Sequence, residues 1–179
     1  MARIQPLTSN EISSSVKIAF ERHIQEYRGR ITNMKATLGY SLPAFEAYMQ
    51  WYPLYEEVEK ILGNRLAYLY AHAVSHAADC PLCSTFFRKI IIDAGENPGK
   101  LDLTEPEKNI LDFGGGIAKH KGNIADHLYN AVAVNYSNTE MIVLIAFAGQ
   151  MIATNIFNNV IETDIDEYLV EYKSPLKNC

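Results

Sequence analysis

The sequence has little cysteine and no excess of basic residues, and each shortage excludes a class of protein. Three cysteines are too few for the disulfide framework of a small secreted domain. The chain carries 16 Lys and Arg against 21 Asp and Glu, a formal net charge of -5, whereas nucleic-acid binding requires clustered positive charge. We therefore expect neither a disulfide-stapled scaffold nor a nucleic-acid-binding protein.

Targeting and membrane signals are also missing. Residues 1–17, MARIQPLTSNEISSSVK, lack the apolar core of a secretory signal. The longest apolar run, Met141 to Gly149, is well short of the roughly 20 residues that span a bilayer. We therefore expect a cytoplasmic protein with no membrane segment. The one basic stretch, Arg28, Arg30 and Lys35, is interpreted as a solvated loop.

Strand-like alternation is absent, and helical periodicity runs through nearly the whole chain. A chain of 179 residues, 48% of them hydrophobic, suits one compact domain with a full core. We predict a single all-α domain over residues 1–179. Its parts are N-terminal helices in 1–62, a core with the C-x-x-C pair in 63–165 and a tail in 166–179.

Caps and glycines set the expected helix boundaries. Thr104 with Glu107 and Ser137 with Glu140 each form a capping box. Asp79 is the expected N-cap of the helix that holds the cysteines. Glycines are expected to end helices at Gly63 and Gly95 and to interrupt or end one at Gly114 to Gly116. The helices are expected at about 9–27, 32–38, 43–53, 54–62, 65–78, 80–94, from 105 onward, 124–134 and 138–162.

The last of these helices is apolar nearly all round. A helix without a polar face lies in the centre of a core or between subunits, so we expect a homo-oligomer. Its apolar residues are Met141, Ile142, Val143, Leu144, Ile145, Phe147, Met151, Ile152, Ile156 and Phe157.

The stretch AADCPLCSTFFR places Cys80 and Cys83 at the start of a predicted helix. Unpaired N–H groups and the helix dipole favour a thiolate there. Since the thiolate is the nucleophile and a second thiol can resolve the product as a disulfide, the pair suits dithiol redox chemistry. Arg88 adds a cation one turn beyond Cys83.

A regular spacing leads up to the cysteine pair. Every fourth position is Tyr68, His72, His76 and then Cys80 itself. An unbroken helix puts such residues on one face in successive turns. A histidine there can accept the thiol proton and return it to a leaving group. The alternative is that one or both histidines fill a polar gap between packed helices.

A zinc site is a further alternative, because His72, His76, Cys80 and Cys83 are all good ligands. His72 and Cys83, however, lie roughly 16 Å apart on a straight helix, whereas zinc ligands lie within roughly 2.0 to 2.3 Å of the metal. His120 or His127 would have to complete the set. We therefore expect no metal and no cofactor. The run of glycines at 114–116 is interpreted as a helix break, since it lacks the Lys-Ser/Thr of a phosphate-binding loop.

The segment Tyr68 to Lys89, YLYAHAVSHAADCPLCSTFFRK, resembles the carboxymuconolactone decarboxylase family, and in particular its alkylhydroperoxidase D-like branch. Leu103 to Glu107, Ile142 to Asn159 and Arg3 to Tyr48 resemble its other helices. The resemblance implies an all-helical subunit that forms trimers or hexamers. It also implies reduction of hydroperoxides by two cysteines, here Cys80 and Cys83, which a protein or small-molecule dithiol recycles.

The chain departs from the redox members of this family. They carry a glutamate twelve residues before the first cysteine and a histidine four residues after the second, where this chain has Tyr68 and Phe87. We expect His76, or His72 if the helix bends, to replace the proton relay, with Tyr68 donating a hydrogen bond.

The first hypothesis is therefore a dithiol oxidoreductase that reduces a small hydroperoxide or disulfide. One alternative is a decarboxylase-like enzyme acting on a small acid or lactone. The other is a non-catalytic binding or assembly protein that keeps the fold.

Overall fold

The computed structural model describes residues 1–174, and no strand occurs among them. The predicted all-α class is confirmed. The α-helices are α1 Ser14–Tyr27, α2 Asn33–Leu38, α3 Leu42–Met49, α4 Trp51–Ala77, α5 Pro81–Asp93, α6 Glu105–Lys119, α7 Asp126–Ala133 and α8 Asn138–Ile161, and a 3-10 helix, η1, covers Glu167–Tyr172.

Side-chain caps fix most helix starts where the sequence predicts them. Both capping boxes, at Thr104 and at Ser137, are formed. The start expected near residue 9 is wrong: α1 begins at Ser14, and Ser13 caps it. Upstream, the Glu11 carboxylate accepts hydrogen bonds from the backbone N–H and the hydroxyl of Thr8, which closes a separate turn.

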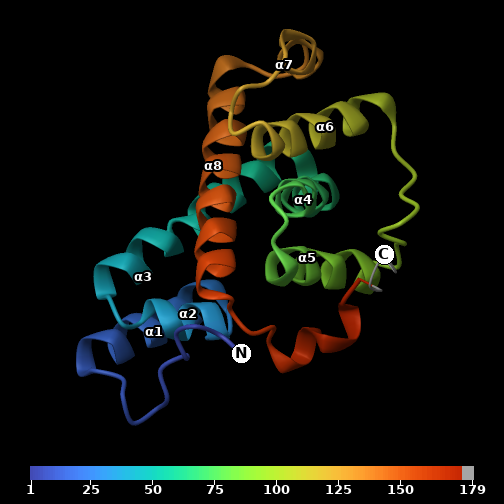
Figure 1. Ribbon diagram of the computed structural model, residues 1–179. Coiled ribbons are helices and arrows are strands. Elements are labelled where there is room, and N and C mark those ends of the chain that lie inside the picture. Colours follow the sequence, from blue (N-terminus) through green and yellow to red (C-terminus); the bar gives the residue numbers. More distant parts are fainter. Residues whose placement is uncertain (175–179) are drawn as a thin grey trace.

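Helix α4 is the centre of the fold, with α5, α6 and α8 packed around it (Figure 1). The Tyr70 hydroxyl donates to the carbonyl of Leu144, which joins α4 to α8. The central core consists of large, fully buried side chains, among them Leu69, Tyr70, Ile91, Ile110, Phe113, Leu144, Phe147 and Met151. Burying this apolar surface is the main force that holds the four helices together.

Two glycine segments behave differently. Gly63, at φ 75° and ψ 159°, breaks α4 into two helical halves, as its position predicts. The expected interruption at Gly114 to Gly116 is wrong, because α6 continues through all three. A Cβ on Gly114 would lie 2.3 Å from Cε2 of Tyr70, so this glycine allows α6 to approach the Tyr70 ring.

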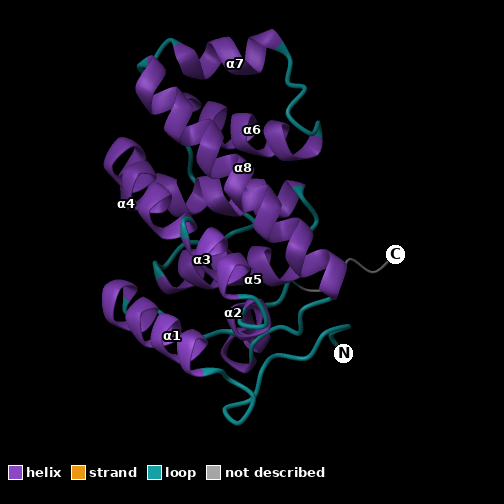
Figure 2. Ribbon diagram, turned by 90° about the vertical axis from the view of Figure 1, so that its left-hand side faces the viewer, coloured by secondary structure: helices purple, strands orange, loops and turns teal. Residues whose placement is uncertain are grey.

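The N-terminal helices form a second cluster at one end of α8, opposite α6 and α7 (Figure 2). The chain after α8 contacts the N-terminal part of the protein: Arg3 N–H donates to Ile161 O, and the Asp166 carboxylate accepts the N–H of Asn33 at the start of α2. The part of the predicted tail that the structure describes therefore includes an ordered element, η1, which packs against α5. Cys179 lies outside the described residues.

Helix α8 is long and apolar enough, by length and composition, to cross a membrane. Core helices pass the same test, and α8 buries Leu144, Phe147 and Met151 against α4. Its other face is exposed and apolar through Ile142, Ile145, Ile156 and Val160.

Candidate functional site

The two cysteines stand at the N-terminus of α5. Cys80, rather than the predicted Asp79, is the N-cap: its sulfur accepts the N–H of Cys83 at 3.4 Å, while Asp79 takes a left-handed conformation at φ 49°. Both cysteines are free and buried, and the pair lies 3.0 Å apart without a disulfide. The fold therefore places two neighbouring, buried, free thiols at the start of a helix.

The two cysteines differ in acidity. The Cys83 thiol donates to the Cys80 sulfur and, with the backbone N–H groups of Leu82 and Cys83, lowers the pKa of Cys80 despite its burial. The same sulfur–sulfur hydrogen bond, burial and the charge on Cys80 raise the pKa of Cys83. The first thiolate therefore resides mainly on Cys80.

Asn158 of α8 acts on the other sulfur. Its side-chain Nδ2 donates to Cys83 Sγ at 3.2 Å and lowers the pKa of Cys83, against the larger effects that raise it. The Asn158 oxygen accepts from the Thr163 hydroxyl at 2.9 Å, which fixes the orientation of the amide. Asn158 thus stabilises negative charge on Cys83 when the shared proton moves to Cys80.

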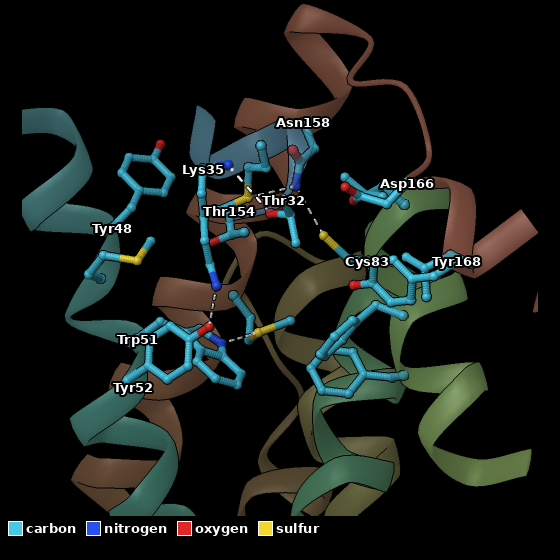
Figure 3. A pocket seen from close by; sticks show the side chains of 17 residues that line it. Thr32, Lys35, Tyr48, Trp51, Tyr52, Cys83, Thr154, Asn158, Asp166 and Tyr168 are labelled. Atoms are coloured by element: carbon cyan, nitrogen blue, oxygen red, sulfur yellow. Dashed lines mark hydrogen bonds between the residues drawn. The ribbon is translucent and has the colours of Figure 1, made fainter. Parts of the chain in front are cut away.

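An apolar cavity of about 120 Å³ opens beside Cys83 (Figure 3). Of the two cysteines, Cys83 lines this cavity, and Cys80 is 1% exposed. Acidity therefore favours Cys80, whereas access favours Cys83. The aromatic part of the wall comes from four segments and consists of Tyr48, Trp51, Tyr52, Phe86, Phe87 and Tyr168.

Lys35 is the cation of this cavity, and its interpretation as a solvated loop residue is wrong. The side chain is 6% exposed because α2 packs it inward. Its ammonium donates to the Arg30 carbonyl at 2.8 Å and to the Tyr52 hydroxyl at 2.7 Å. Burial lowers the pKa of Lys35 to about 8, so the group remains mostly charged at neutral pH.

Asp166 is the anion of the cavity, and Figure 3 shows it across from the Lys35 ammonium. Its carboxylate accepts the backbone N–H of Asn33 at 2.9 Å. Burial raises the pKa of Asp166, partly offset by the Asn33 N–H and by attraction to Lys35. Within residues 1–174, no ion pair of 4.0 Å or less joins Lys35 to Asp166.

The predicted histidines lie outside this cavity. His72 and His76 occupy the last turns of α4, and their rings stack at 6.0 Å. Burial, with the nearby His76 and Arg88, lowers the pKa of His72 to about 4. Within residues 1–174, no hydrogen bond joins either histidine to a thiol.

Tyr68 is engaged elsewhere too. Its hydroxyl donates to Glu96 at 2.9 Å, and Arg65 holds the same carboxylate with three hydrogen bonds. Among the described residues, no three His, Cys, Asp or Glu side chains come together as a metal-ligand set.

Solved structures with this arrangement of helices include two of a debrominase. The apo form of the debrominase Bmp8 superimposes with a TM-score of 0.75 at 17% identity, covering 94% of this chain and 95% of that one. A cysteine-to-alanine variant of Bmp8 in complex with 2,3,4-tribromopyrrole gives 0.76 at 17% identity, with 94% of each chain covered.

A third structure, an uncharacterized peroxidase-related protein from Silicibacter sp. TM1040, gives a TM-score of 0.69 at 12% identity, covering 93% of this chain and 94% of that one. The chain has the alkylhydroperoxidase D-like fold. By sequence it matches no family profile and no curated protein.

On this alkylhydroperoxidase D-like fold, sequence reasoning missed Lys35, Tyr52, Asn158 and Asp166. They come from four separate segments, so no local spacing joins them. One signal was available: Asn158 is a polar residue in a mainly apolar helix, although Thr154, Asn155 and Asn159 nearby give the same signal.

Proposed function

We propose that this protein is a dithiol reductase, in which Cys80 and Cys83 give two electrons to a small molecule held in the cavity. The observation that carries the proposal is the free thiol pair with Cys83 in the cavity wall and Asn158 donating to its sulfur. The enzymatic neighbours on the same fold, a debrominase and a peroxidase-related protein, support an enzyme of this general kind.

In the proposed first step, the Cys83 proton moves to the Cys80 sulfur, and the Cys83 thiolate attacks. With a hydroperoxide, the S–O bond forms as the O–O bond breaks, which leaves a sulfenic acid on Cys83, and the departing alkoxide takes a proton to become the alcohol. Cys80 then attacks Cys83, expels water and closes the disulfide. Overall, ROOH and two thiols give ROH, water and a disulfide, which an external dithiol reduces.

A second substrate, a halogenated ring, is favoured by the aromatic wall and the small volume of the cavity. The Cys83 thiolate attacks the halogen, the S–halogen bond forms and the carbon–halogen bond breaks, and the ring carbon takes up a proton. Cys80 then displaces halide from Cys83. Overall, a ring halide and two thiols give the ring with hydrogen, a proton, halide and a disulfide.

The test uses reduced protein in a Cys179→Ser background, so that two thiols remain. We expect tert-butyl hydroperoxide to consume both thiols, with a Cys80–Cys83 disulfide as product. The halide route is tested with 2,3,4-tribromopyrrole and measurement of released bromide. If both thiols survive both reagents, the reductase proposal is wrong.

The two alternatives have their own signatures. Full turnover of a small acid or lactone by a Cys80→Ser, Cys83→Ser double variant would indicate the decarboxylase. The binding protein predicts unreactive thiols and no turnover.

A homo-oligomer is a further part of the proposal. The exposed residues Ile142, Ile145, Ile156 and Val160 repeat along one face of α8, and an apolar face of this length favours burial against a second copy. Sedimentation is expected to give more than one subunit, and Ile145→Glu with Ile156→Glu is expected to give monomers. A monodisperse wild-type monomer at micromolar concentration would remove this proposal.

A further inference from the structure

Lys35 carries a buried positive charge that no carboxylate in residues 1–174 neutralises within ion-pair distance. An ammonium has three N–H donors, and the Arg30 carbonyl and the Tyr52 hydroxyl accept two of them. Burying such a charge is costly unless a partner compensates it. The third donor and a charge that Asp166 offsets only from a distance are both features of a site for an anion.

Tyr52 adds a second donor at the same place. Its oxygen accepts from Lys35, and its own O–H has no acceptor among the described residues. Burial raises the pKa of Tyr52 to about 12, so the hydroxyl stays protonated and able to donate at neutral pH. Figure 3 shows the Lys35 and Tyr52 tips meeting at the cavity wall. Two donors, one of them charged, therefore lie together in the wall of a mainly apolar cavity.

The size of the cavity limits the rest of the ligand. Its volume of about 120 Å³ is slightly smaller than the roughly 150 Å³ of an apolar cavity that holds benzene. The wall beside Cys83 contains the rings of Trp51, Phe86, Phe87 and Tyr168, which suit a flat apolar body. A volume of this order matches a single ring better than a fused ring system or a peptide.

We propose that the cavity binds a single-ring organic anion, with its oxyanion on Lys35 and Tyr52 and its ring beside Cys83. As a statement about the substrate, this rests on the proposed dithiol reductase. As a statement about binding, it rests on the cavity alone. Charge-assisted hydrogen bonds in a low-dielectric site favour such a ligand over a neutral compound of the same shape.

Other titratable groups face Lys35 from the elements packed around it. His23 of α1 is neutral at neutral pH, because burial and the Lys35 charge lower its pKa to about 4. Tyr52 is protonated, and Arg30 lies 4.7 Å over the ring of Tyr168 on the far wall. Asp166 attracts Lys35 and opposes an incoming anion. Removing the Asp166 charge should therefore strengthen anion binding, and removing the Lys35 charge should weaken it.

Binding can be measured without turnover, because Trp51 is the only tryptophan of the chain and lines the cavity. Benzoate and benzamide have nearly the same shape and differ in charge. Titrated against Trp51 fluorescence at pH 7, benzoate is expected to bind about 10- to 100-fold more tightly than benzamide. Benzoate stays ionised at higher pH, so this preference should fall as the pH rises through about 8, where Lys35 loses its proton.

Variants assign the preference to its source. Lys35→Met should abolish it together with its pH dependence, Tyr52→Phe should reduce it, and Asp166→Asn should increase it. Lys60→Met, an exposed lysine paired with Glu57, is the matched control and should leave it unchanged. Equal affinities for benzoate and benzamide, or a preference that persists in folded Lys35→Met, would overturn the anion site. If Lys35→Met does not fold, an unchanged preference in Tyr52→Phe overturns it.

A variant without the two cysteines separates the test of this anion site from the test of the proposed reductase. A Cys80→Ser, Cys83→Ser variant should keep the benzoate preference, because neither sulfur binds the oxyanion. A benzoate preference with inert thiols would sustain the anion site and remove the reductase. Reactive thiols without any benzoate preference would do the reverse.

Discussion

The two halves of α4, on either side of Gly63, contribute differently to the site. The second half carries Tyr68, His72 and His76, whose regular spacing attracts attention in the sequence, yet none of them lines the cavity. The first half places Trp51 and Tyr52 in the cavity wall. Spacing along one helix identifies a shared face, but the cavity is made where distant segments meet.

The largest effect is expected at Cys83. In the Cys179→Ser background, Cys83→Ser should reduce turnover to the uncatalysed rate, because the thiol that meets the substrate is gone. The Cys80→Ser variant should instead react with one molecule of hydroperoxide and stop. Cys83 should then remain as the sulfenic acid, which mass spectrometry of its peptide detects. Normal turnover by the Cys83→Ser variant would show that Cys80, not Cys83, is the nucleophile.

The next effect concerns Asn158 and uses its neighbour as a control. Asn158→Ala removes the donor to Cys83 Sγ and should slow thiol oxidation by about 10- to 100-fold, because hydrogen bonds to charged groups are worth about 1.5 to 3 kcal/mol. Asn159→Ala removes an exposed amide bound to the carbonyls of Ala78 and Asp79 and should leave the rate nearly unchanged. Equal losses in the two variants would mean that Asn158 acts through the fold, not the sulfur.

The cavity wall should also cost stability, unlike the packed half of α4. The folded-state pKa of Lys35 is about 8 against 10.5 for the free side chain, so the unfolded chain binds this proton more tightly. Stability should therefore rise with pH between about 8 and 10.5, by on the order of 3 kcal/mol for this group. Urea unfolding at several pH values measures this rise. In Lys35→Met the contribution should disappear, and stability at pH 7 should increase.

The packed half of α4 should instead respond to volume. Gly114→Ala puts a Cβ against the buried Tyr70 ring and should destabilise the protein by about 1 to 3 kcal/mol. In Gly115→Ala the added methyl meets its nearest atom at 3.7 Å, so the better helix propensity should stabilise by roughly 0.5 to 1 kcal/mol. Thermal unfolding should show shifts of opposite sign, and equal shifts would contradict the close approach.

The smallest effect is expected from the histidines. If the chemistry occurs in the cavity, His72→Ala and His76→Ala should each change the rate of thiol oxidation by less than about two-fold. The proton-relay role predicted for them requires a far larger loss, about 10² to 10⁴ in rate for a general acid or base. The pH profile of thiol oxidation in the two variants decides between these predictions.

Local signals in the sequence were sufficient for the class and most helix boundaries. The boxes at Thr104 and Ser137 and the break at Gly63 depend on neighbours in the chain, and the structure has all three. Gly114 misled because its role depends on Tyr70, which is 44 positions away in the chain. The resemblance to the alkylhydroperoxidase D-like fold was confirmed through structure, since the sequences share at most 17% identity with the solved neighbours reported above.

The site was only half predictable for the same reason. The sequence identifies Cys80 and Cys83 by their spacing and by their position at the start of a predicted helix. The Lys35 ammonium meets Tyr52 from 17 positions away, and Asn158 meets Cys83 from 75. Lys35 was expected at the surface but is buried, because α2 packs its side chain inward. The packing of α2 cannot be read from one charged residue in the sequence.

The central claim is that Cys83 attacks a small molecule in the cavity while Cys80 takes its proton and then resolves the product. The most direct measurement is mass-spectrometric mapping of the Cys80→Ser, Cys179→Ser variant after tert-butyl hydroperoxide, with a thiol reagent that traps sulfenic acid. The account predicts the trapped adduct on Cys83 and, in the protein with both cysteines, a Cys80–Cys83 disulfide. An unmodified Cys83 in the variant, together with an intact dithiol in that protein, would contradict it.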